Sequence, residues 1–141
     1  MKVKVGEIVN VYPVIMKSSF AKMNGKAKLG MVRIIKAMKP VVSEFEEVRQ
    51  DAIKKLAGDD YQQALPKVQK PNDYKEDEVK EALKVVKASD EAYAKFMQEE
   101  CEKEVEVDYQ MLKEDDFEAL LEGSKDLTPQ ELMLLSELIS E

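Results

Sequence analysis

The residues of this chain that could carry chemistry are carboxylates and one thiol, because the sequence contains no His. Histidine is the commonest general base and metal ligand, so Ser-His and Cys-His nucleophiles are excluded. The single cysteine, Cys101, has acidic neighbours that disfavour its thiolate. A zinc site needs several Cys or His ligands and a disulfide needs two Cys, so one Cys without His excludes both within this chain. The sequence therefore predicts a protein that is not an enzyme, with no catalytic residue, metal site or cofactor.

Four carboxylates form the densest acidic cluster, and they are Glu114, Asp115, Asp116 and Glu118. Such a group could bind Ca²⁺ or Mg²⁺, or act as an acid and base pair. It lacks the alternating ligands and central glycine of a calcium-binding loop. Acids in the first turn of a helix are favoured by the helix dipole alone. We therefore interpret the cluster as the start of a helix.

Seven Lys and Arg residues lie between Lys17 and Lys39. In this stretch, Lys26, Lys28 and Arg33 are the candidate phosphate contacts. The formal charge of −7 argues against nucleic acid as the ligand, because it repels a polyanion at long range. That charge is unevenly distributed, at +8 over residues 1–40, −3 over residues 41–98 and −12 over residues 99–141. We expect the basic start to dock on the acidic end.

Most of the elements that position these acidic and basic groups are predicted to be helices, because apolar residues recur at helical spacing. Apolar residues recur at alternating spacings of three and four from Met31 to Leu56, which predicts a long helix from about residue 26 to residue 57. A helix with a proline inside it is expected from about residue 7 to residue 23, and a third long helix from about residue 75 to residue 101. Two short helices should follow, and the second begins with the capping box Thr128-Pro129-Gln130-Glu131.

Two short strands complete the prediction, because Val3 and Val105 each lie in runs that alternate apolar and charged residues. We expect the two strands to pair. The fold class is therefore mainly α with a minor α+β character: a long helix hairpin, short terminal helices and a two-stranded antiparallel ribbon. Residues 1–141 are predicted to form one helical domain, with an irregular connector at 59–74 and an acidic C-terminal subregion at 105–141.

The order of these elements resembles a family of small, uncharacterised helical proteins encoded by phages and prophages. The similar segments are Ile8-Val9-Asn10 followed by Pro13-Val14, then Asn24-Gly25-Lys26-Ala27, Phe45-Glu46-Glu47-Val48-Arg49, residues 105–112 and residues 127–138. The resemblance covers most of the chain but is weak over residues 59–104. It implies a phage context and no recognised enzymatic activity, and it assigns a role to no residue.

The leading hypothesis is a non-enzymatic phage or prophage accessory or assembly protein that acts through protein–protein contacts. Its expected contact residues are Met31, Met38, Phe45, Leu132, Leu135 and Leu138. The C-terminal helix should be the detachable element, and the partner is a phage or host protein or a second copy of the chain. The alternatives are an acidic anti-defence inhibitor that mimics nucleic acid, and nucleic-acid binding through the basic N-terminal region. No run of apolar residues is long enough for a membrane span, so we expect a cytoplasmic location in a bacterial host.

Overall fold

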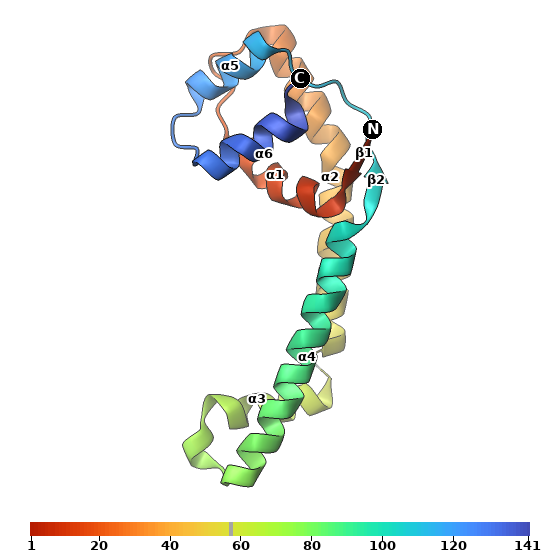
Figure 1. Ribbon diagram of the computed structural model, residues 1–141, viewed down its shortest axis with the longest axis vertical. Helices are drawn as coiled ribbons and strands as arrows, with labels where there is room; N and C mark the ends of the chain where they lie inside the picture. Colours follow the sequence, from red (N-terminus) through yellow and green to blue (C-terminus); the bar gives the residue numbers. More distant parts are fainter. Residues whose placement is uncertain (57) are drawn as a thin grey trace. The chain divides into compact units, whose positions relative to one another are not determined.

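A computed structural model describes residues 1–56 and 58–141, and it confirms a mainly helical fold with a two-stranded antiparallel sheet (Figure 1). The elements are β1 (Lys2–Lys4), α1 (Val5–Lys17), α2 (Gly25–Leu56), α3 (Asp59–Gln69), the 3-10 turn η1 (Pro71–Asp73), α4 (Glu76–Glu102), β2 (Glu104–Glu106), α5 (Glu114–Gly123) and α6 (Pro129–Ile139). The sequence suggests one domain, whereas the described residues group into two compact units. The first unit is Met1–Phe45 with Cys101–Glu141, and the second unit is Glu46–Glu100.

The sheet of the first unit pairs β1 with β2, as the sequence predicts. Lys2 lies opposite Glu106 and Lys4 opposite Glu104, so charges of opposite sign face each other across the ribbon. Between them, Val3 turns toward the core and is 6% exposed. The terminal amine of residue 1 also lies 2.5 Å from a carboxylate oxygen of Glu106. Part of the expected docking of the basic start on the acidic end is therefore present.

The core of the first unit lies between α1, α2 and α6, and α1 and α6 lie side by side (Figure 1). Apart from Ala27, these helices contribute nine core side chains with an exposed fraction of 5% or less: Ile8, Val11, Val14, Ile15, Met31, Ile34, Met38, Leu135 and Ile139. Each such side chain contributes about 1.5–3 kcal/mol through burial. The Tyr109 hydroxyl donates a hydrogen bond of 2.7 Å to the carbonyl oxygen of Leu138. The end of α6 is thus held by apolar packing and by a buried polar contact.

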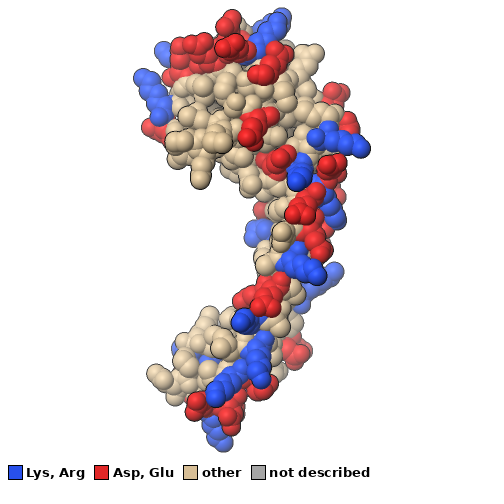
Figure 2. Space-filling view, viewed as in Figure 1, with Lys and Arg blue, Asp and Glu red and all other residues tan. Residues whose placement is uncertain are grey.

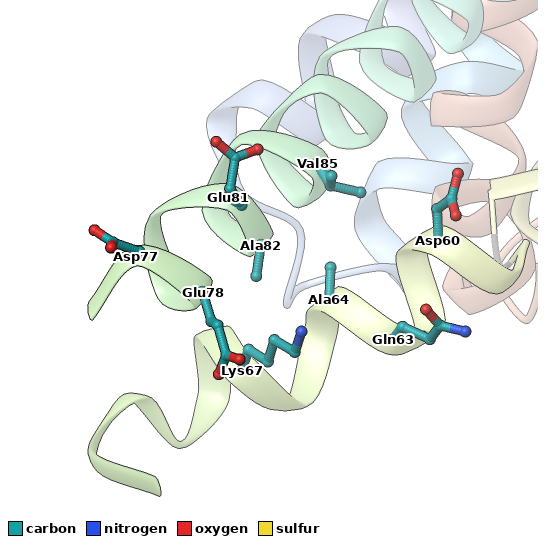
Figure 3. Close-up of a pocket in the computed structure, with 9 residues that line it drawn as sticks. All are labelled: Asp60, Gln63, Ala64, Lys67, Asp77, Glu78, Glu81, Ala82 and Val85. Carbon is teal, nitrogen blue, oxygen red and sulfur yellow. The ribbon is translucent and has the colours of Figure 1, made fainter. Parts of the chain in front are cut away.

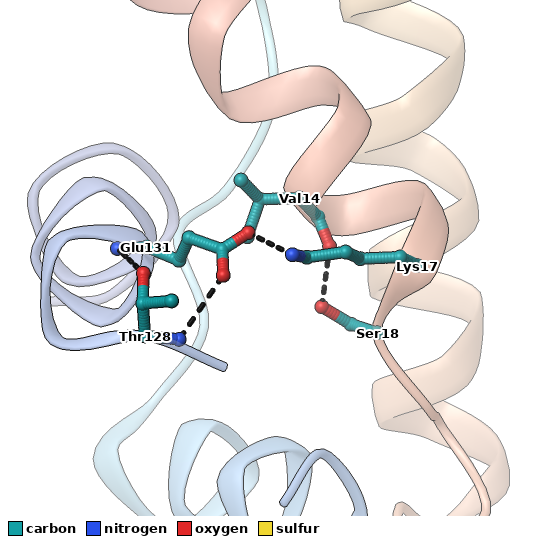
Figure 4. Close-up of polar contacts among 5 residues, drawn as sticks. All are labelled: Val14, Lys17, Ser18, Thr128 and Glu131. Carbon is teal, nitrogen blue, oxygen red and sulfur yellow. Dashed lines mark hydrogen bonds and ion pairs between the residues drawn. The ribbon is translucent and has the colours of Figure 1, made fainter. Parts of the chain in front are cut away.

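The start of α6 is fixed by the predicted capping box (Figure 4). The Thr128 hydroxyl accepts from the backbone amide of Glu131, and the Glu131 carboxylate accepts from the backbone amide of Thr128. The same carboxylate forms an ion pair with Lys17 at the end of α1. The hydrogen bond from Lys17, followed by that from the Thr128 backbone, holds the pKa of Glu131 below the ordinary value of 4.5.

The lowered pKa of Glu131 predicts a loss of stability in acid. A carboxylate with a depressed folded-state pKa stabilises the fold above its unfolded-state value, and that contribution disappears as the pH falls through the folded-state value. We expect Glu131→Gln to flatten the dependence of the urea midpoint on pH below 4.5, because glutamine keeps the cap but loses the charge. Glu137→Gln, at an exposed position of α6, is the matched control. Equal pH profiles for both variants would contradict the assigned role of the ion pair.

Helix α1 differs from its prediction at both ends. The sequence suggests that Gly6 ends the strand, but Gly6 lies in the first turn of α1. A β carbon added at Gly6 would lie 2.9 Å from the β carbon of Cys101, so glycine permits this close approach. The helix ends at Lys17 rather than near residue 23, and the Ser18 hydroxyl donates to the carbonyl oxygen of Val14 (Figure 4). Cys101 is thus a half-buried packing residue.

In the second unit, residues 59–69 form α3, so the prediction of an irregular connector over residues 59–74 is wrong for most of its length. Pro66 lies inside α3 and removes one backbone donor without ending the helix. Apolar residues at helical spacing explain why: α3 and α4 share a small core of Ala64, Ala82 and Val86, flanked by Tyr61, Leu65, Val68 and Val85. Packing against α4 outweighs the cost of the proline.

Candidate functional site

Most of the predicted contact residues lie in the core of the first unit. Met31, Met38 and Leu135 are completely buried, and Leu138 is 6% exposed. They cannot serve as an exposed contact surface in this conformation, so this part of the prediction is corrected. Their apolar side chains belong to the same core cluster as buried residues of α1 instead of remaining open. The other two, Phe45 and Leu132, are half-buried.

The predicted phosphate contacts, in contrast to most of the predicted protein contacts, lie on the surface. Lys26, Lys28 and Arg33 are all exposed on α2. Over the part of the chain that the structure describes, none of the three forms an ion pair. The ion pairs that use the basic start are those of residue 1 with Glu106 and of Lys17 with Glu131. The ion pairs that hold the basic start to the acidic end therefore do not use Lys26, Lys28 or Arg33.

An apolar groove in the second unit is the best candidate for a contact surface. One wall comes from the end of α2, with Val48, Ala52 and Leu56, and the other from α4, with Ala92, Tyr93 and Phe96. The groove has a volume of about 430 Å³, within the range of about 300–1,000 Å³ that is typical of ligand sites. Phe96 is 40% exposed. The α2 wall is the second half of the same apolar seam whose first half is buried.

An ion pair on α2 lies near the Tyr93 wall of this groove. The Arg49 guanidinium donates to a carboxylate oxygen of Glu46, with nitrogen–oxygen distances of 2.9 and 3.2 Å. The Glu46 hydrogen bond and charge, with a smaller effect from Tyr93, raise the pKa of Arg49. The Tyr93 wall of the groove therefore has a charged residue of α2 near it.

The rim of the groove carries one charge of each sign. Asp51 and Lys55 stand four residues apart on α2 and line the groove beside its apolar floor. Neither forms an ion pair with another residue in the described ranges, 1–56 and 58–141. An aromatic and aliphatic floor with a polar rim is the usual anatomy of a protein-binding surface.

A second hollow in the same unit lies between α3 and α4, with a volume of about 400 Å³ (Figure 3). Its rim carries four carboxylates and one amine: Asp60, Asp77, Glu78, Glu81 and Lys67. Among the described residues, no three acidic, Cys or His side chains are placed to hold a metal ion. The acids at the start of α4 are explained by the helix dipole. The predicted acidic cluster at residue 114 is likewise the first turn of α5.

The groove could have been found only partly from sequence. Its α2 wall belongs to the periodic seam, but the α4 wall comes from a stripe that acidic residues interrupt, such as Asp90. The charge gradient along the sequence does not separate into a basic half and an acidic half on the face shown in Figure 2. In Figure 2, acidic and basic side chains are interspersed on the visible face of each unit.

No helix in the described part of the chain combines the length and apolar character needed to cross a membrane. Comparison of the chain with models of known protein families, with curated proteins and with solved structures finds no match.

Proposed function

We propose that the protein is a non-enzymatic binding protein that acts through protein–protein contacts, with the α2–α4 groove of the second unit as its contact surface. The supporting observation is the exposed Phe96 beside the half-buried Tyr93 on an apolar floor. Aromatic residues of this kind dominate the energy of most protein interfaces. The resemblance to phage-encoded proteins supports an accessory or assembly role in a phage or prophage, in the cytoplasm of the bacterial host.

The occupant that fits this groove is an amphipathic helix of a partner protein. Two roughly parallel helical walls with an apolar floor suit the apolar stripe of a third helix, whose anchors recur at spacings of three and four. The charged residues at the rim determine which charges the partner helix needs. It needs a basic residue opposite Asp51 and an acidic residue opposite Lys55. Since Asp51 and Lys55 are one helical turn apart, the partner's two charges should also be one turn apart.

Replacing Phe96 tests the proposal. We expect Phe96→Ala to weaken capture of the partner from infected bacterial cells by at least about tenfold, because loss of a central aromatic anchor typically costs about 2 kcal/mol or more. Leu83→Ala is the matched control, since Leu83 is 52% exposed on the same helix and is not part of the groove lining. Captured proteins would be identified by mass spectrometry and their binding quantified with purified partner.

The expected result is one protein retained by the wild type and by Leu83→Ala but lost with Phe96→Ala. Circular dichroism would verify that both variants keep their helices. Equal capture by both variants would refute the groove as the contact surface. Capture of nothing but a second copy of this chain would refute a separate partner and would assign the groove to self-association.

A further inference from the structure

The first half of α2 carries an uninterrupted basic surface. The chain has no acidic residue between Glu7 and Glu44. Over this stretch α2 exposes five cations, Lys26, Lys28, Arg33, Lys36 and Lys39. None of the five is in an ion pair within the described ranges. We call these five residues the basic face.

Four of the five cations of the basic face lie in two rows on α2, and the fifth, Lys36, lies between the rows. At 100° per residue, Lys28 and Lys39 lie on one flank of the helix, and Lys26 and Arg33 lie about 140° further round. Two exposed aliphatic residues stand between the flanks, with Leu29 at 50% and Val32 at 41% exposure. The thirteen-residue span from first to last cation corresponds to about 20 Å along the axis. The helix therefore presents two charged flanks on either side of a partly apolar ridge.

A hollow adjoins one of these flanks. Its volume is about 470 Å³, and its α2 wall contains Gly30, Arg33 and Lys36. The opposite wall contains Asp108 and Gln110. The hollow is therefore lined by two cations, Arg33 and Lys36, by one side-chain amide and by one carboxylate. A sugar–phosphate group next to Arg33 could be held by cation and amide donors together.

We propose that the basic face binds double-stranded DNA by placing α2 in the major groove. That groove is about 12 Å wide and admits an α-helix, with phosphates along both of its edges. Two cationic flanks match those two edges, and Leu29 and Val32 would lie over the base pairs, where the thymine methyl group offers an apolar contact. Lys36, between the flanks, would also face the base edges, where a lysine can donate to guanine.

The acidity of the rest of the chain sets the conditions for this binding. With a formal charge of −7, the protein as a whole repels DNA, so attraction is limited to short range and is reduced steeply by salt. Four flank cations predict a slope of about −3.6 for the logarithm of the association constant against the logarithm of salt concentration. Binding should thus be measurable at low ionic strength and should weaken sharply toward physiological salt.

Fluorescence anisotropy with a labelled duplex of about 20 base pairs tests the proposal across a salt series. The double variant Lys28→Gln/Arg33→Gln removes one cation from each flank. We expect it to reduce the slope by about two and the affinity at low salt by at least about tenfold. The matched control is Lys87→Gln/Lys95→Gln, which removes the same charge from exposed positions of α4. The control should bind like the wild type.

Three results would overturn the proposal. The first is no binding of the duplex at low salt, and the second is an equal effect of the two double variants. The third is that single-stranded DNA or polyglutamate binds as tightly as the duplex and is lost with the same α2 variant. In that case the basic face would be a general polyanion or acidic-protein surface. Circular dichroism of each variant would verify that the helices are retained.

Discussion

A chain shortened to end at Asp126 should not fold its first unit. The deletion removes α6, which supplies Leu135, Leu138 and Ile139 to the core. At about 1.5–3 kcal/mol for each buried side chain, the loss is comparable with the whole stability of about 5–15 kcal/mol of a small domain. Further contacts disappear with it, because the Leu112 amide donates to the carbonyl oxygen of Ile139 at 2.6 Å.

Amide hydrogen exchange followed by NMR is the measurement that checks this deletion. We expect the amides of α1 and of α2 up to Phe45 to lose protection in the shortened chain. Met133→Ala is the control, because Met133 lies on α6 but is 62% exposed, and exposed substitutions usually change stability by less than about 0.5 kcal/mol. Native-like protection of α1 in the shortened chain would show that α6 is the detachable element suggested by its short, terminal position.

Elements that depend mainly on residues close together in the sequence are predicted correctly. The capping box at Thr128 is formed as predicted, because its hydrogen bonds join residues three apart. The seam from Met31 to Leu56 predicts α2 closely, because one periodic face runs through the whole helix. The ribbon is also correct, since alternation identifies its inward residue, Val3, and opposite charges suit its outward pairs.

Features that depend on tertiary packing could not be predicted in this way. Pro66 and the neighbouring breakers suggest a loop, yet contacts with α4 keep α3 helical. The contact surface is the clearest case, because the seam does not show which half is covered by other helices. Burial of Met31 depends on packing against α1 and α6, whereas Val48 lines an open groove in the second unit. Periodicity identifies an apolar face, but only the fold decides whether that face is core or surface.

The core and surface positions of α2 can be separated by a matched pair of substitutions. Met31 is completely buried, whereas Leu29, two residues earlier on the same helix, is 50% exposed. We expect Met31→Ala to lower the free energy of unfolding of the first unit by about 2–5 kcal/mol, because it deletes packed atoms and leaves a cavity. Leu29→Ala should change it by less than about 0.5 kcal/mol.

Urea unfolding followed through NMR signals of the first unit measures both changes without interference from the second unit. Both substitutions convert a long apolar side chain into alanine in the same helix, so intrinsic helix propensity contributes little to the difference between them. The difference therefore reports burial. A Met31→Ala variant as stable as Leu29→Ala would mean that Met31 is exposed in solution, and it would restore Met31 to the contact surface that the sequence suggests. A large difference would confirm that Met31 belongs to the core of the first unit and not to a contact surface.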